Sequence, residues 1–100
     1  MRLDDYQLQA ARTRNAALAP RDRMLDAASG LAEEAGEVLG LVRKHLMHDK
    51  ALDRDQLALE LGDALWCLAA VASDAGWTLE DVAAANLAKL RQRHPDGFKP

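Results

Sequence analysis

Apolar and polar positions along this chain repeat with the period of an α-helix, and no segment alternates with the period of two that marks a strand. Prolines, glycines and capping residues divide the pattern into four helical segments. The connections between them are short, which favours antiparallel neighbours. The sequence therefore predicts an all-α, four-helix bundle-like fold, with residues 1–100 forming a single domain.

Capping signals predict where each helix begins and ends. A polar residue is found at each of the four expected helix starts. In three of them an acid or amide follows three residues later: Asp4 with Gln7, Asp53 with Gln56, and Thr78 with Asp81. The remaining start is at Asp22. The expected ends are Ala19 before Pro20, about Met47, Gly76, and the residues before Pro95.

The third expected helix combines an apolar surface with two acids. From Leu57 to Ala72 only Glu60, Gly62 and Asp63 are not apolar. A helix that is apolar on nearly all sides is normally buried, and an uncompensated buried charge costs several kcal/mol. No lysine or arginine falls between Arg54 and Lys89 to compensate these acids. A divalent cation held by carboxylates from two helices is the economical explanation.

A second pair of acids, Glu34 and Glu37, has the same spacing on the preceding helix. At about 100° per residue, both helices have an apolar face, made of Leu31, Ala35, Val38, Val42 and Leu46 on one, and of Leu57, Leu61, Ala64, Leu68 and Val71 on the other. The acid pairs lie at equal offsets from Leu31 and Leu57, so packing the two faces together would bring both pairs to the rim of one seam. Hard oxygen ligands favour Mg²⁺, Mn²⁺ or Ca²⁺.

Composition limits the classes of partner. A chain of 100 residues with four aromatics buries only a modest core, so partner chains are expected. The net charge of −3 indicates no nucleic-acid surface. The lone Cys67 fits a reducing compartment. The N-terminus has no signal-peptide pattern, and the apolar run at 57–72 is expected to be too short and too charged to span a membrane. A cytoplasmic protein is expected.

The fourth helix has polar residues on its inward stripe of Leu79, Val82, Ala83 and Leu90. Asn86 falls in the middle of this stripe, with Lys89 and Arg93 at its edge. In one interpretation Asn86 makes a buried hydrogen bond and the cations extend to solvent. In the other, these three residues and Lys44, two turns beyond Glu37, hold an anionic ligand next to the acids. A metal and several cations together imply phosphate.

These residues make the chain resemble the MazG-like, all-α nucleoside triphosphate pyrophosphohydrolase superfamily. The family's mark is E-E-x-x-E followed some twenty residues later by E-x-x-D, which here is Glu33-Glu34-Ala35-Gly36-Glu37 and Glu60-Leu61-Gly62-Asp63. The segments Ala85–Leu90 and His94–Phe98 are similar to the family as well, as are Tyr6-Gln7 and Arg12-Thr13. Each motif is weak alone, but the ordered set at this spacing is fairly specific.

The resemblance implies hydrolysis of an NTP or dNTP to the monophosphate and pyrophosphate, with Mg²⁺, replaceable by Mn²⁺, as cofactor. It implies that Glu34, Glu37, Glu60 and Asp63 ligate the metal and that Glu33 acts as a general base or holds a water. Lys44, Asn86, Lys89 and Arg93 would hold the phosphates. The family also favours a homodimer or homotetramer, with sites that can borrow residues from a neighbouring chain.

Three other interpretations concern the kind of metal centre, the role of Trp66 and the function. A di-iron bundle would use Glu-x-x-His pairs, and none of His45, His48 and His94 follows a Glu at that spacing. Trp66 fills the core, a subunit interface or a nucleobase pocket. A non-catalytic acidic helical oligomer that binds a metal or a nucleotide is the alternative function.

Overall fold

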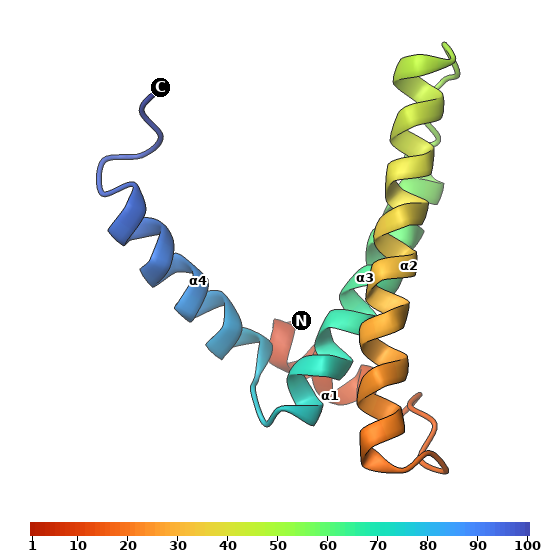
Figure 1. Cartoon of the computed structure of the whole chain (residues 1–100), viewed down its shortest axis with the longest axis vertical. Helices are drawn as coiled ribbons and strands as arrows, with labels where there is room; N and C mark the ends of the chain where they lie inside the picture. The colour runs from red at the N-terminus through yellow and green to blue at the C-terminus, as the bar shows by residue number, and fades with distance from the viewer.

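The computed structural model describes residues 1–100 and contains four α-helices and no strand. The helices are α1 (Leu3–Ala11), α2 (Pro20–Met47), α3 (Arg54–Asp74) and α4 (Leu79–Arg93). Long α2 and α3 run antiparallel beside each other, α1 crosses near their lower end, and α4 rises away from them to leave an open V (Figure 1). The predicted all-α fold with antiparallel neighbours is confirmed.

Capping residues account for the starts of α3 and α4. Asp53 accepts the backbone N–H of Gln56 at 3.0 Å, and Thr78 and Asp81 form the predicted capping box, so α3 and α4 begin as expected. The positive φ of 81° at Gly76 follows the end of α3. Asp22, however, does not cap α2, because α2 already begins at Pro20, whose fixed φ suits the first helical turn. The predicted end of α2 at Met47 is confirmed.

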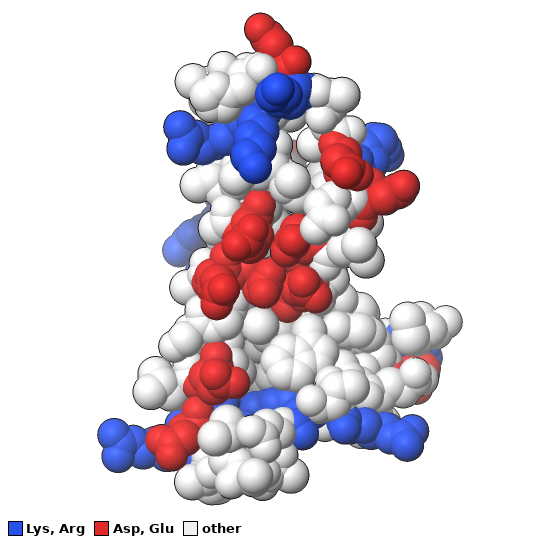
Figure 2. Space-filling view, turned by 90° about the vertical axis from the view of Figure 1, so that its right-hand side faces the viewer, with Lys and Arg blue, Asp and Glu red and all other residues white.

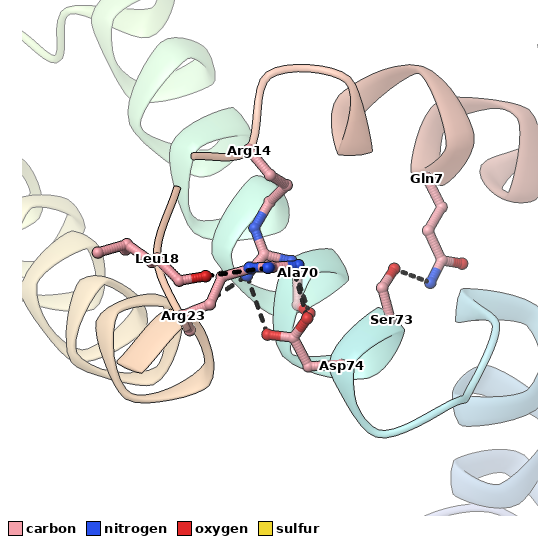
Figure 3. A network of polar contacts seen from close by, with 7 residues as sticks. All are labelled: Gln7, Arg14, Leu18, Arg23, Ala70, Ser73 and Asp74. Atoms are coloured by element: carbon pink, nitrogen blue, oxygen red, sulfur yellow. Dashed lines mark hydrogen bonds and ion pairs between the residues drawn. The ribbon is translucent and has the colours of Figure 1, made fainter. Parts of the chain in front are cut away.

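The prediction for α1 was wrong at both ends. The helix begins after Arg2, whose N–H donates to Asp5, while Asp4 instead accepts the N–H of Glu80. It ends at Ala11 rather than Ala19, and two residues of the segment that follows, Thr13 and Arg14, make long-range bonds to α3. Arg14 donates to Asp74 at 2.9 Å and to the Ala70 carbonyl at 3.3 Å (Figure 3).

A small-residue seam joins α2 to α3. Ala27 and Ala70 are buried, and a Cβ placed on Gly30 would lie 2.9 Å from Cys67 Sγ, so the helices approach closely there. The expected apolar faces form only part of this seam. Half-buried members are Leu31, Val38, Val42, Leu57, Ala64 and Val71, whereas Ala35, Leu46, Leu61 and Leu68 are exposed. Compared with the expected packing, α2 and α3 are rotated so that their small residues meet. This places Glu34 and Glu60 in the seam rather than at its rim.

The core is small. Only seven of the 100 residues are buried, and none of the large side chains is fully enclosed. In α4 only Leu79 is buried, so Val82, Ala83 and Leu90 do not form the expected inward stripe within one chain. The reason is that α4 diverges from α3 and has no contact with α2.

By length and mean hydropathy α3 is able to cross a membrane. The expectation that its apolar run is too short and too charged was therefore wrong by these two measures. A single helix of this kind is a weak indication, because core helices have the same composition. Here α3 packs against α1 and α2 and carries Glu60 and Asp63 in the first half of its length.

Candidate metal and phosphate site

Three carboxylates from two helices converge midway along the α2–α3 pair. Oxygens of Glu34, Glu60 and Asp63 all lie within 4.8 Å of one another. Glu34 and Glu60 are half-buried and Asp63 is exposed, so the group opens to solvent on one side. On this face acidic side chains gather at the middle and most of the Lys and Arg lie toward the two ends (Figure 2). We call this surface the acid face.

The seam positions these acids. Glu34 follows Gly30 by one turn on α2, and Glu60 precedes Cys67 by two turns on α3, so both lie on the line where the backbones approach closely. The side-chain amide of Gln56 donates to Glu60 Oε1 at 2.8 Å and restrains that carboxylate. Small residues in the seam therefore place two acids from different helices face to face.

The electrostatics of the group favour a cation. Partial burial raises the pKa of Glu34, and a side-chain hydrogen bond with Glu60 and repulsion from Asp63, Glu60 and Glu33 raise it further. Burial, with repulsion from Glu34 and Asp63, likewise raises the pKa of the Cys67 thiol. These carboxylates repel one another and have no Lys or Arg partner among the ion pairs. Their oxygen chemistry and spacing fit a hard divalent cation.

The remaining predicted residues lie outside this group. Glu33 and Glu37 are exposed on α2, and Lys44 is exposed near the end of α2. Asn86, Lys89 and Arg93 are exposed on α4, which makes no contact with α2. Within one chain, the structure brings three of the predicted acids together and leaves the predicted phosphate-binding residues of α4 apart from them.

Two residues near the site were not predicted from the sequence to belong to it. Tyr6 of α1 is half-buried, and burial together with repulsion from Asp63 raises the pKa of its phenol. Gln56, expected only as part of a capping box, takes part in the cap through its backbone N–H, while its side chain contacts Glu60. The spacing of four residues between Gln56 and Glu60 could have indicated that contact, whereas nothing local connects Tyr6 to Asp63.

Trp66 does not lie in the acid group. Its indole N–H donates to Thr13 Oγ1 at 2.7 Å, and the Arg14 guanidinium lies 5.9 Å from its ring centroid. The side chain is half-buried against the segment that follows α1. In this structure Trp66 packs within its own chain.

Comparison with known proteins shows the family to which the chain belongs. A family model described as the MazG nucleotide pyrophosphohydrolase domain matches residues 24–98, which include α2, α3 and α4 except for the first residues of α2. The chain therefore belongs to the MazG nucleotide pyrophosphohydrolase family. It is also 33% identical over 108 residues to the Gene 37 protein of Mycobacterium phage L5, covering 97% of this chain and 92% of that protein. No solved structure matches the chain significantly.

Proposed function

We propose that the protein hydrolyses a nucleoside triphosphate, NTP or dNTP, to the monophosphate and pyrophosphate in the cytoplasm, with Mg²⁺ as cofactor and Mn²⁺ as a substitute. The observation that carries this proposal is the convergence of Glu34, Glu60 and Asp63 within 4.8 Å in a chain of this family. No nucleic acid or membrane is required as a partner.

Each acid has a proposed role. Glu34, Glu60 and Asp63, joined by Glu37 one turn along α2, would hold the metal. The bound cation would neutralise phosphate charge and make water a better nucleophile. Exposed Glu33 would accept the proton of the attacking water. The water oxygen bonds to the α-phosphorus, the bond from that phosphorus to the bridging oxygen breaks, and pyrophosphate leaves with that electron pair.

Cationic and amide side chains would hold the triphosphate and the leaving pyrophosphate. Lys44, Asn86, Lys89 and Arg93 are the proposed groups, because positively charged or amide donors gain strength as negative charge builds on the departing oxygens. Three of these lie on α4, apart from the acids of the same chain. This separation supports a homo-oligomer, a dimer or a tetramer, as the active form.

A nucleotide panel with Mg²⁺ tests the function. Products are resolved so that monophosphate with pyrophosphate is distinguished from diphosphate with phosphate. We expect the former products with at least one NTP or dNTP, and loss of turnover in Glu37→Gln and Asp63→Asn with helical content retained. Asp55→Asn, an exposed acid outside the site, is the matched control.

The outcomes separate the two functions considered. Turnover that persists in Glu37→Gln or Asp63→Asn would remove that acid from the site. Metal and nucleotide binding without any turnover in the wild type would instead identify a non-catalytic binding protein.

A further inference from the structure

One amide side chain contacts the acid group of Glu34, Glu60 and Asp63. Gln56 Nε2 donates to Glu60 Oε1 at 2.8 Å, across one turn of α3. Gln56 is exposed, whereas Glu60 is half-buried in the seam. The amide therefore lies at the solvent edge of the group, on a carboxylate of the proposed metal site.

The same glutamine is restrained at its backbone. Its N–H donates to Asp53 Oδ1 at 3.0 Å, and Asp53 is the N-cap of α3. This cap holds Gln56, the third residue of the helix, in the first turn. Two hydrogen bonds therefore connect Asp53, Gln56 and Glu60 in series, from the start of α3 to the acid group.

Gln56 and Asp63 flank Glu60 on α3. Gln56 precedes Glu60 by four residues and Asp63 follows it by three, so the three side chains share one side of the helix. Glu34 approaches from α2, and oxygens of the three acids lie within 4.8 Å of one another. Glu60 is thus held between an amide donor on one side and two carboxylates on the other.

Repulsion among the acids makes this restraint necessary. None of the three acids forms an ion pair with Lys or Arg, and like charges at this distance disfavour each other. Without a partner, the flexible side chain of Glu60 would turn away from Glu34 toward solvent. The amide bond keeps the carboxylate in the seam, as outer hydrogen-bond partners commonly do for metal ligands.

The bond also limits how Glu60 can ligate a cation. The Gln56 N–H occupies Oε1 and fixes the orientation of the carboxylate, which leaves Oε2 without an amide donor. Ca²⁺ takes about six to eight oxygen ligands in flexible geometry and can use both oxygens of a carboxylate, whereas Mg²⁺ requires an octahedral arrangement and retains several waters. A carboxylate that offers a single oxygen therefore suits Mg²⁺ better than Ca²⁺.

We propose that Gln56 is a positioning residue of the metal site, which holds Glu60 so that one oxygen, Oε2, ligates the cation, and which thereby favours Mg²⁺ over Ca²⁺. Gln56 acts through Glu60 and does not ligate the cation itself. This role rests on the proposed function, because Glu60 is a ligand only if the acid group binds the cofactor.

Calorimetric titration of the metal-free protein, without nucleotide, tests this role. Gln56→Met keeps the helix propensity of the side chain but removes the N–H. We expect its affinity for Mg²⁺ to fall about tenfold. Its affinity for Ca²⁺ should stay close to that of the wild type, because the released carboxylate can use both oxygens. Gln9→Met, the same change at an exposed position of α1, should leave both affinities unaltered.

A double variant tests whether Asp53 acts through Gln56. Asp53→Ala removes the cap and should also weaken Mg²⁺ binding. When it is combined with Gln56→Met, the affinity for Mg²⁺ should be no lower than in Gln56→Met alone. Circular dichroism checks that each variant keeps its helical content. Losses of affinity that add would show that the two residues act separately, and would overturn their connection in series.

The outcomes separate this role from the proposed function. Wild-type affinities for both cations in Gln56→Met would overturn the role, and so would an equal loss for Mg²⁺ and Ca²⁺. A wild type that binds Mg²⁺ more tightly than Gln56→Met does, but releases no pyrophosphate from any nucleotide, would overturn the proposed function alone. A wild type that binds neither cation would overturn both.

Discussion

The Gln7 side chain of α1 accepts the backbone N–H of Leu79, the first residue of α4, at 2.7 Å. Its amide donates to the Trp77 carbonyl and to Ser73 Oγ, each at 2.9 Å. One buried side chain thus joins α1, the end of α3 and the start of α4. Because only the base of α4 is buried, these bonds hold the direction in which α4 leaves the α2–α3 pair.

Replacing Gln7 should therefore destabilise the fold. In Gln7→Ala the buried N–H of Leu79 loses its acceptor, and an unsatisfied buried group costs about 1 to 3 kcal/mol. We expect a loss in this range in the free energy of unfolding, measured by urea titration at one protein concentration. Gln9→Ala, an exposed residue of the same helix, should change little. Equal stabilities of the two variants would show that the Gln7 bonds do not position α4.

The ion pair between Arg14 and Asp74 should be the most sensitive polar contact. The two side chains are only 11% and 15% exposed, and they lie 2.9 Å apart. Removing one partner of a buried pair costs about 3 kcal/mol, so Asp74→Asn should lower the urea midpoint strongly. Glu80→Gln alters an exposed pair with Arg2 at 3.9 Å and should leave the midpoint unchanged. A midpoint for Asp74→Asn close to that of the wild type would contradict this role.

Gly30 should tolerate a methyl group only if Cys67 is made smaller. A Cβ at this position would lie 2.9 Å from Cys67 Sγ, and overpacking costs about 1 to 3 kcal/mol. We expect Gly30→Ala to lower the melting temperature and Cys67→Ala, added to it, to restore part of the loss. A methyl group on Gly36 would meet nothing within 4 Å, so Gly36→Ala should stabilise α2 by up to about 1 kcal/mol. A stabilised Gly30→Ala single variant would refute close packing at the seam.

The cluster of Glu34, Glu60 and Asp63 allows a prediction of how the free energy of unfolding depends on pH in the absence of metal. The folded-state pKa of Glu34 lies above its ordinary value of 4.5. As the pH falls from 7 through that raised pKa, the folded chain binds a proton before the unfolded chain does, and its stability should rise. This contribution is complete once the pH falls below 4.5. Melting temperatures in EDTA across this window measure it.

Two comparisons identify Glu34 as the source of that pH dependence. Glu34→Gln should flatten the rise, whereas Asp55→Asn should keep it. Mg²⁺ at pH 7 should raise the melting temperature of the wild type, and this gain should shrink as Glu34 becomes protonated. An unchanged pH profile in Glu34→Gln would place the origin of the dependence elsewhere.

Local spacing was sufficient to predict that the chain forms four helices and to single out Glu34, Glu60 and Asp63, which the structure brings together. Thr78 with Asp81 and Asp53 with the Gln56 N–H cap their helices through residues three apart, so the start of α3 and of α4 follows from the sequence alone. The family resemblance rested on similarly short motifs and is confirmed. Features that depend on close neighbours along the chain can therefore be predicted from the order of residues.

The end of α1, the composition of the seam and the direction of α4 were decided only by tertiary structure. Beyond the end of α1, Arg14 pairs with Asp74, 60 residues away, and Gln7 accepts the N–H of Leu79, 72 residues away. α2 and α3 approach closely at Gly30 and Cys67, which are small residues, whereas several of the large apolar residues expected there are exposed. Helix formation follows from residues three and four apart, whereas helix direction depends on which distant groups can satisfy a buried charge, amide or N–H.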